Sequence, residues 1–315
     1  MTSKPLVSII IPVYNGGDYL REAIDSALAQ TYAPIEVLVV NDGSKDDGAT
    51  ARIAAEYGEA IRYFEKENGG VSSALNCGIR NMRGAYFSWL SHDDAYEPRK
   101  VEAQVAALPE DGEKVLVYCN FSTMNSRSEP MPDTKAACRP QKDMSPREAL
   151  HQVLRHGSLN GCGFLIPREA FDECGGFDET LRYAQDSLMW YRLFSGGWSV
   201  RVVPEPLVRS RVHENQQTQK NRSKFTADNQ AICREMLPVF DRLSTDGDDF
   251  VLEYALRSAI KGEGQNVRLC RQTLKQSGRL RLSARIRLLL TAVYGRVRPL
   301  VRRIYYRLFR RIRTG

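Results

Sequence analysis

The segment LVSIIIPVYNGGDYLREAIDSALAQ, residues 6–30, determines the fold class of this 315-residue chain. Its first part, Leu6 to Val13, is an apolar, β-branched run that is typical of a strand buried on both faces. The part from Asp18 to Gln30 carries apolar residues at helical spacing. A buried strand that passes directly into such a helix predicts an α/β protein with parallel strands.

The same alternation continues for three more strands. We expect strands at 35–40, 61–64 and 85–90, and helices at 49–57 and 71–82. This order predicts a mainly parallel central sheet flanked by helices, a fold class whose ligands bind at the carboxyl ends of the strands.

The second half of the chain is less regular. We expect strands at 115–121 and 199–203, and we interpret the polar segment 123–143 as a flexible loop or lid. From Asn215 onward the pattern is helical. The expected organisation is an α/β domain over 1–215, a helical extension over 216–278 and a basic amphipathic helical tail over 279–315.

Charge is distributed unevenly along the chain. The formal net charge is +7, yet residues 279–315 hold 12 arginines and no acidic residue, which leaves 33 basic against 38 acidic residues elsewhere. A nucleic-acid partner is therefore not expected. Seven cysteines without CxxC spacing argue against a disulfide framework and a zinc site, and favour a reducing cytosol.

Carboxylates follow two of the expected strands. Asp42 can accept hydrogen bonds from a nucleobase or ribose, or can form an Asx turn. Asp93 and Asp94 are adjacent, so their carboxylates repel each other unless a cation or hydrogen-bond donors hold them. A divalent cation with oxygen ligands is the usual solution. The alternative is that the pair binds no metal and that Asp94 caps the following helix. Neither GxGxxG nor GxxxxGK[ST] occurs, which removes the Rossmann dehydrogenase and P-loop classes.

Five segments together resemble the family-2 inverting glycosyltransferases with a GT-A fold. In order they are VSIIIPVYNGGDYLREAIDSALAQTY, IEVLVVNDGSKDD, ENGGVSSALNCGIRNMRGAYFSWLSHDD, GGFDETLRYAQDSLMWYRL and the later His213. The resemblance covers residues 5–215. It implies the GT-A (nucleotide-diphospho-sugar transferase) fold, a nucleotide-sugar donor with UDP favoured, a Mn or Mg ion, and inverting transfer of a hexosyl or N-acetylhexosaminyl group to a hydroxyl.

The resemblance also assigns site residues by position. Donor binding falls on Pro12, Tyr14, Asn15, Asp42, Asn68, Gly69, Ser73, His92 and Asp93. Metal binding falls on Asp93, Asp94 and His213. The resemblance implies that Asp186 is the general base. The physics agrees with this role, since a carboxylate in the first turn of a helix stays ionised and can accept the proton of the acceptor hydroxyl; the alternative role is stabilisation of that helix alone.

Three positions depart from the family pattern: Ser91 replaces a common Asp, Leu75 a common Arg, and Gln185 the more usual Glu. These departures motivate an alternative function, a catalytically impaired nucleotide-sugar-binding or scaffold protein. Arg209 and Arg211 either neutralise the leaving diphosphate or are surface charges. The three tryptophans are expected in the core, with stacking on a sugar face as the alternative for Trp198.

The tail pattern favours a membrane surface. Apolar residues recur at steps of three and four from Val297 to Ile312, and arginines occupy the other face, so a helix from Pro299 would lie in the plane of an anionic bilayer. The segment 280–293 forms a first amphipathic stretch with Arg285 and Arg287 outward. We expect peripheral attachment to the cytoplasmic face of a membrane, which suits a glycan or lipid-linked glycan acceptor in bacterial surface-polysaccharide synthesis. Packing on the catalytic domain or another subunit is the alternative.

Overall fold

The computed structural model describes residues 4–109, 112–132, 139–213, 225–245 and 248–295. The chain divides into two compact units, unit 1 (Met1–Phe225) and unit 2 (Thr226–Gly315). The expected helix from Pro299 lies outside the described residues.

Unit 1 is built on one mixed sheet with the strand order β3-β2-β1-β4-β8-β6-β9-β5, and β7 pairs with β6. The strands are β1 (Val7–Val13), β2 (Ile35–Asn41), β3 (Arg62–Glu65), β4 (Tyr86–Trp89), β5 (Ala95–Tyr96), β6 (Val115–Met124), β7 (Pro130–Met131), β8 (Phe164–Pro167) and β9 (Ser199–Arg211). Strands β3, β2, β1 and β4 run parallel, whereas β8 is antiparallel to both its neighbours. The predicted α/β class is confirmed, and its parallel character belongs mainly to the N-terminal half.

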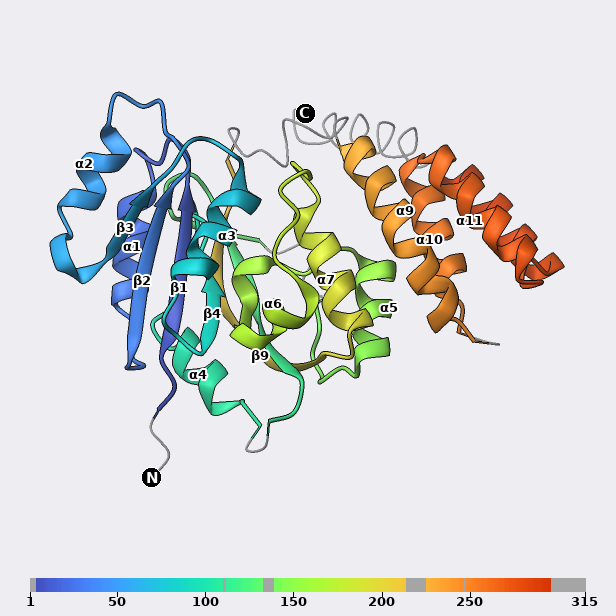
Figure 1. The fold of residues 1–315 in the computed structure, drawn as a ribbon, viewed down its shortest axis with the longest axis horizontal. Coiled ribbons are helices and arrows are strands. Elements are labelled where there is room, and N and C mark those ends of the chain that lie inside the picture. The colour runs from blue at the N-terminus through green and yellow to red at the C-terminus, as the bar shows by residue number, and fades with distance from the viewer. Residues whose placement is uncertain (1–3, 110–111, 133–138, 214–224, 246–247, 296–315) are drawn as a thin grey trace, which may run out of the picture. The chain divides into compact units, whose positions relative to one another are not determined.

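Helices cover both faces of this sheet, as Figure 1 shows for α3 and α1 on opposite sides of β1. The helices are α1 (Leu20–Leu28), α2 (Ala49–Ala55), α3 (Val71–Asn81), α4 (Lys100–Ala106), α5 (Pro146–His156), α6 (Arg168–Cys174) and α7 (Gln185–Ser195). Every residue of β1 is buried, because a central parallel strand packs against helices on both sides. The β-branched run of residues 7–13 is the sequence signature of that position.

Strand β9 is much longer than the expected 199–203. Pro204 and Pro206 lack the N–H group that a ladder requires, so the sequence pattern indicates an end there. The structure continues the strand to Arg211 by shifting the register against β6 around Asn120, whose side-chain amide donates to the Pro204 carbonyl at 2.9 Å. Strand β5, which the sequence analysis missed, pairs with β9 beyond these prolines. This extension carries the chain to His213.

The segment expected to be a loop over 123–143 is partly strand. Strand β6 extends to Met124, and the turn after it is held by Asn125, whose Oδ1 accepts hydrogen bonds from the backbone of Arg127 and Glu129. Strand β7 then pairs back onto β6. Residues 133–138, in the remainder of the expected lid, lie outside the described residues.

The core of unit 1 contains a lysine. Lys100, on α4, is fully buried, and its ammonium group donates a 2.6 Å hydrogen bond to the Ser88 hydroxyl of β4. The same group lies 4.0 Å from the centroid of the Tyr96 ring. Burial lowers the pKa of Lys100 from 10.5 to about 8, because the charged form loses its hydration.

The contribution of Lys100 to the stability of unit 1 is therefore expected to grow as the pH rises from about 8 to about 10.5. In that range the unfolded chain still binds the Lys100 proton that the folded chain has released, so this contribution to the free energy of unfolding increases with pH. Urea unfolding followed by tryptophan fluorescence reports on this unit alone, because Trp89, Trp190 and Trp198 all lie in it. The gain, at most about 3 kcal/mol, should disappear from the Lys100→Met profile.

The difference between the two profiles isolates Lys100, because the buried neighbours of Lys100 contribute to the pH dependence of both proteins. Burial raises the pKa of Cys119 to about 11 and raises the pKa values of Cys162 and Tyr96 well above their usual ranges. Parallel profiles for the wild type and Lys100→Met would contradict the prediction.

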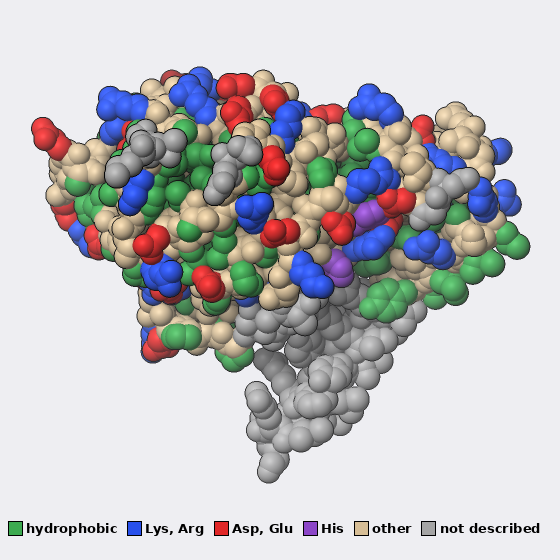
Figure 2. Space-filling model, turned by 90° about the horizontal axis from the view of Figure 1, so that it is seen from below, with side chains coloured by type: hydrophobic (Ala, Val, Ile, Leu, Met, Phe, Trp, Pro, Cys, Tyr) green, Lys and Arg blue, Asp and Glu red, His purple; other side chains and the backbone are tan. Residues whose placement is uncertain are grey.

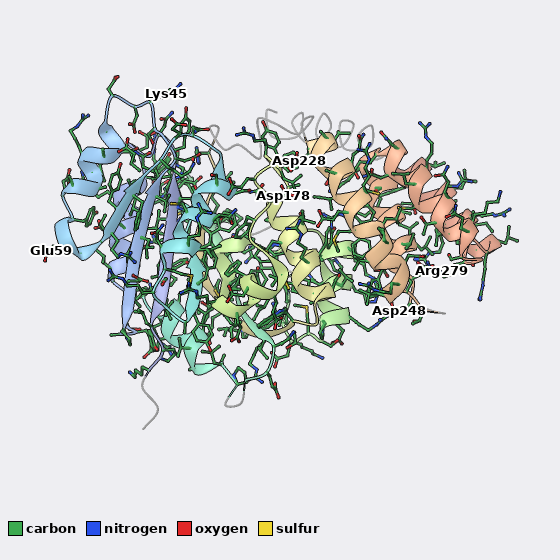
Figure 3. The ribbon with its side chains drawn as sticks, viewed as in Figure 1. Lys45, Glu59, Asp178, Asp228, Asp248 and Arg279 are labelled. Atoms are coloured by element: carbon green, nitrogen blue, oxygen red, sulfur yellow. The ribbon has the colours of Figure 1, made fainter. Side chains whose placement is uncertain are left out.

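The helices of unit 2 are α9 (Phe225–Leu243), α10 (Phe250–Lys261), α11 (Gly264–Gln276) and a further helix over 282–295. Helices α10 and α11 pack against each other most extensively. Asn229 of α9 is bridged to the α10–α11 turn, since its side chain donates to Glu263 at 2.7 Å and its carbonyl accepts from Asn266 at 3.1 Å. Arg279, labelled in Figure 3, forms ion pairs with Asp241 and Asp249. Within the part of the chain that the structure describes, no helix combines the length and apolar character needed to cross a bilayer.

Candidate active site

Three neighbouring parallel strands deliver polar side chains to one edge of the sheet. The ends of β1 and β2 are in register, with Val13 opposite Asn41, and β4 lies on the other side of β1. The residues that follow these strands, namely Tyr14 and Asn15, then Asp42, then the run from Ser91 to Asp94, therefore share the carboxyl edge. Ligands of open α/β sheets bind at this edge.

The loops after β1 and β2 are joined by hydrogen bonds. Asn15 adopts a left-handed backbone conformation with φ of 55°. Its N–H donates to the Ser44 hydroxyl at 2.8 Å, and its side-chain oxygen accepts from the Lys45 N–H at 2.7 Å. Figure 3 labels Lys45 in the loop that precedes α2. Tyr14 is left 38% exposed beside these bonds, available to a ligand.

Asp42 organises the loop before α3. Its side chain is almost fully buried, and its carboxylate accepts hydrogen bonds from the N–H groups of Gly69 at 3.0 Å and Gly70 at 2.7 Å. Lys66 donates to the same carboxylate at 2.8 Å. Gly70 has φ of 89°, which only glycine adopts without strain. A carboxylate offers about four acceptor positions, so one remains for a ligand donor.

The other donor-side residues lie near Asp42. The Asn68 side chain donates to the Asp42 carbonyl at 2.9 Å. A Cβ on Gly69 would meet the Ser73 side chain at 2.7 Å, so the loop and the first turn of α3 are in close contact. The structure thus brings Asp42, Asn68, Gly69 and Ser73 together. Leu75, where the family resemblance leads us to expect Arg, is fully buried, and Lys66 supplies a positive charge to Asp42.

Asp93 and His213 form the second centre of the site. The Asp93 carboxylate lies 3.0 Å from Nε2 of His213, and the two side chains are 17% and 13% exposed. The His213 ring stacks obliquely on Tyr19, with 5.3 Å between centroids. The two residues are 120 positions apart in sequence, and the extension of β9 brings them together. An oxygen and an imidazole nitrogen are thus presented together at a partly open surface.

His92 and Asp94, on either side of Asp93, have inward roles. Burial lowers the pKa of His92, whose half-buried side chain hydrogen-bonds the backbone of Pro12 at the end of β1. The Asp94 carboxylate accepts the Arg211 N–H at 2.8 Å and the Cys162 thiol at 3.5 Å. Burial and the neighbouring Asp93 charge raise the pKa of Asp94 to about 8. Its geometry does not support the expected role of Asp94 as a metal ligand.

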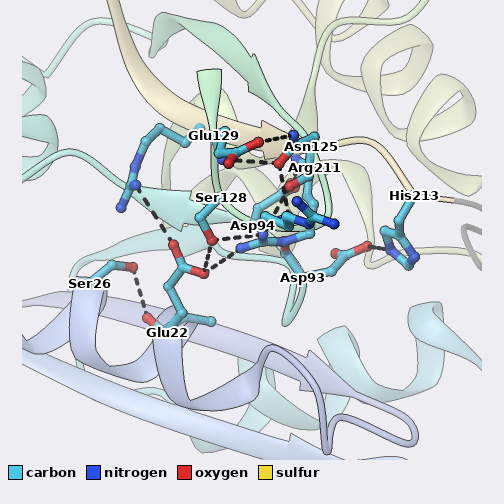
Figure 4. A network of polar contacts seen from close by, with 12 residues as sticks. Glu22, Ser26, Asp93, Asp94, Asn125, Ser128, Glu129, Arg211 and His213 are labelled. Atoms are coloured by element: carbon cyan, nitrogen blue, oxygen red, sulfur yellow. Dashed lines mark hydrogen bonds and ion pairs between the residues drawn. The ribbon is translucent and has the colours of Figure 1, made fainter. Parts of the chain in front are cut away.

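Arg211 is the hub of the network in Figure 4, and its side chain is fully buried. Its guanidinium donates to the Asp93 carbonyl at 2.7 Å and to the Ser128 hydroxyl at 2.9 Å, and it forms an ion pair with Glu22 of α1. Its guanidinium carbon lies 4.3 Å from the Tyr19 ring centroid. Arg211 is therefore a buried support for Asp93, and its burial contradicts the alternative that it is a surface charge.

Asp186 lies in the first turn of α7 and is partly exposed. One of its oxygens accepts the Ser158 hydroxyl at 2.8 Å, and the other lies 2.6 Å from the Ser187 N–H. The loop before α7 is tied to α3, because the Asn76 side chain exchanges hydrogen bonds with the backbone of Phe177 and donates to Glu179. Trp190 of α7 is fully buried, as is Trp198, which confirms the core assignment of both.

The sequence analysis missed Glu22, Asn76 and Cys162. Glu22 is one of several charged residues on an amphipathic helix, and nothing in its local pattern marks it as the partner of Arg211. Cys162 is not part of a CxxC motif, so its sequence context gave no signal. Its sulfur accepts a hydrogen bond from the Ser91 N–H at 3.3 Å, and its thiol donates to the Asp94 carboxylate. Glu22 and Asn76 both lie in segments that resemble the family, whereas Cys162 lies outside them.

Residues 8–175 match the model of Glycosyl transferase family 2. The chain belongs to this family. It is 49% identical over 216 residues to an uncharacterized glycosyltransferase of Rickettsia prowazekii, which covers 68% of this chain and 66% of that protein. It is 32% identical over 225 residues to the uncharacterized glycosyltransferase EpsJ of Bacillus subtilis, which covers 68% of this chain and 63% of the relative. The chain thus spans just under two thirds of the length of these relatives.

The crystal structure of S. aureus TarS 1–349 in complex with UDP-GlcNAc has the same fold. Its TM-score is 0.65 at 17% sequence identity, and the match covers 92% of this chain and 81% of that one. The prediction of a GT-A α/β fold in a family-2 glycosyltransferase is confirmed.

Proposed function

We propose that the chain transfers a sugar from a nucleotide-sugar donor to an acceptor hydroxyl with inversion of the anomeric centre. The observation that carries this proposal is the placement of the Asp93–His213 pair, together with the loop organised by Asp42, at the ligand-binding edge of the sheet. UDP is the favoured nucleotide, since the fold matches a protein that was crystallised with UDP-GlcNAc. A hexosyl or N-acetylhexosaminyl group is the proposed cargo.

In the proposed reaction Asp186 acts as the base. The acceptor oxygen attacks the anomeric carbon, its proton passes to the Asp186 carboxylate, and the bond from carbon to the diphosphate oxygen breaks with its electron pair on the leaving nucleoside diphosphate. Ser158 holds one Asp186 oxygen by a hydrogen bond, which orients the carboxylate before the proton transfer.

Asp93 and His213 would hold a Mn or Mg ion, which when bound neutralises the charge of the leaving diphosphate. Carboxylate and imidazole donors fit such an ion, and their partial exposure leaves room for diphosphate oxygens to complete its shell. Among the residues that the structure describes, no group of three or more His, Cys, Asp and Glu side chains could hold a metal alone. The proposed ion is therefore shared with the donor.

A glycan or lipid-linked glycan acceptor in bacterial surface-polysaccharide synthesis remains our proposal for the pathway. It rests on the family and on the basic tail. The second candidate function is a catalytically impaired nucleotide-sugar-binding or scaffold protein, which the changes at Ser91, Leu75 and Gln185 favour. Turnover of a donor distinguishes the two.

The test is thermal unfolding of the full chain with UDP-, GDP-, dTDP- and CMP-sugars, each with Mn, Mg or EDTA. A ligand at a hundredfold excess over its Kd adds about 2.7 kcal/mol to the free energy of unfolding, so one nucleotide class should raise the melting temperature in a metal-dependent way. Asp93→Asn should lose the metal dependence, because an amide is a weaker ligand than a carboxylate.

The matched control is Asp172→Asn, which changes an exposed carboxylate on α6 and should keep the full response. Absence of a shift with all four nucleotide classes would refute donor binding. A shift of equal size in EDTA would refute the role of the metal.

A further inference from the structure

The helix over 282–295 in unit 2 exposes apolar side chains where a packed helix normally exposes polar ones. Leu282, Leu289 and Leu290 are 72%, 66% and 63% exposed. Ile286, Val293 and Tyr294 are also about half exposed, at 48%, 52% and 57%. These six residues define the outer apolar face. Soluble proteins rarely expose a large contiguous apolar patch, and such a patch usually marks an interaction site.

The spacing places these residues on one side of the helix. Steps of four and three join Leu282 to Ile286, Leu289 and Val293, which is the period of a single helical face. Ala284 and Leu288, on the opposite side, are almost fully buried within unit 2. The helix is thus anchored by its inner side, and the outer apolar face is left open.

Arginines border this face on both sides. Arg285 and Arg287 are exposed, as the sequence predicted, but the outer apolar face is exposed as well. At about 100° per residue these two arginines lie on opposite margins of the apolar face. Figure 2 shows green hydrophobic side chains beside blue Lys and Arg side chains on unit 2. An apolar strip with basic margins is the pattern of a helix that lies in a bilayer interface.

Charge distinguishes three candidate partners for this face: the rest of the chain, a second copy of the protein and a lipid surface. The remaining chain, 296–315, carries eight arginines and no acidic residue, so the tail would bring positive charge to positive margins. A second copy of the chain would do the same across a symmetric contact. An anionic lipid surface is complementary both to the margins and to the tail.

We propose that the outer apolar face of the 282–295 helix lies on the surface of a bilayer that contains anionic lipid. The apolar side chains enter the boundary between head groups and acyl chains, and Arg285 and Arg287 contact the lipid phosphates. This inference goes beyond the transfer reaction and does not depend on it, since lipid binding requires neither donor nor acceptor.

The experiment is co-sedimentation of the full chain with phosphatidylcholine vesicles, with and without phosphatidylglycerol. We expect strong binding only when phosphatidylglycerol is present, and weaker binding as salt is added. The double variant Leu289→Gln/Leu290→Gln should bind at least about tenfold more weakly, because two leucines no longer enter the membrane. It keeps all arginines, so the loss reports on apolar contact alone.

The matched control is Leu28→Gln, which changes an exposed leucine on α1 of unit 1 and should bind as the wild type does. Equal vesicle binding by the double variant and the wild type would overturn the proposal, since the tail alone would then account for it. Absence of binding to anionic vesicles would also overturn it, and so would dimerisation in solution that the double variant abolishes. Unchanged thermal unfolding of each variant confirms that unit 2 remains folded.

Discussion

Replacing Asp186 with asparagine is expected to lower the rate of sugar transfer by a factor of about 10²–10⁴ while donor affinity stays unchanged. Asparagine has the same shape and still offers an oxygen to the Ser158 hydroxyl, which lies 2.8 Å from the carboxylate. It cannot accept the proton of the acceptor hydroxyl. The measurement is the transfer rate with saturating donor, together with the donor Kd from calorimetry.

Two controls give this experiment its meaning. Asp172→Asn removes an exposed carboxylate from α6 and should leave the transfer rate unchanged. Ser158→Ala removes only the hydrogen bond that orients Asp186, so it should slow transfer much less than Asp186→Asn. An Asp186→Asn enzyme that transfers at the wild-type rate would remove Asp186 from the mechanism and leave it as a charge that stabilises α7.

Replacing Arg211 with methionine is expected to lower the free energy of unfolding of unit 1 by about 3–5 kcal/mol. The guanidinium is fully buried, and its removal leaves the Asp93 carbonyl and the Ser128 hydroxyl without this donor. It also leaves Glu22 without its closest ion-pair partner. Urea unfolding followed by tryptophan fluorescence measures the loss, because all three tryptophans lie in unit 1.

Arg209→Met is the matched control, since Arg209 also faces Glu22 from β9. Its side chain is 35% exposed and lies 3.7 Å from Glu22, so the loss should be at most about 1 kcal/mol. The double variant Glu22→Gln/Arg211→Met should be more stable than the sum of the single losses predicts, by about 1–3 kcal/mol. Equal losses for Arg209→Met and Arg211→Met would contradict the buried role of Arg211.

The first half of unit 1 could be predicted because its signals are local. The run from Val7 to Val13 is buried throughout, as its β-branched composition predicts, and the residues after each parallel strand meet at one edge by topology alone. The position of Asp42 and Asp93 in the site follows from that rule. Their placement required no knowledge of packing.

The second half could not be predicted in the same way. The prolines of β9 interrupt the strand pattern, and the strand continues only because β6 and β5 supply partners around them. The two adjacent aspartates, Asp93 and Asp94, have different surroundings for a similar reason. Asp93 faces His213, whereas Asp94 turns inward to the backbone of Arg211, and no local property of the pair distinguishes them.

The sequence by itself determined the α/β class, the family and the strand ends that carry the site, because these depend on periodicity and on the order of short motifs. The tertiary structure alone decided that Arg211 is buried on Glu22, 189 positions away, and that the 282–295 helix turns its apolar side outward. Such features depend on contacts between residues far apart in sequence. Burial, charge pairing and exposure are properties of those contacts, and no local pattern encodes them.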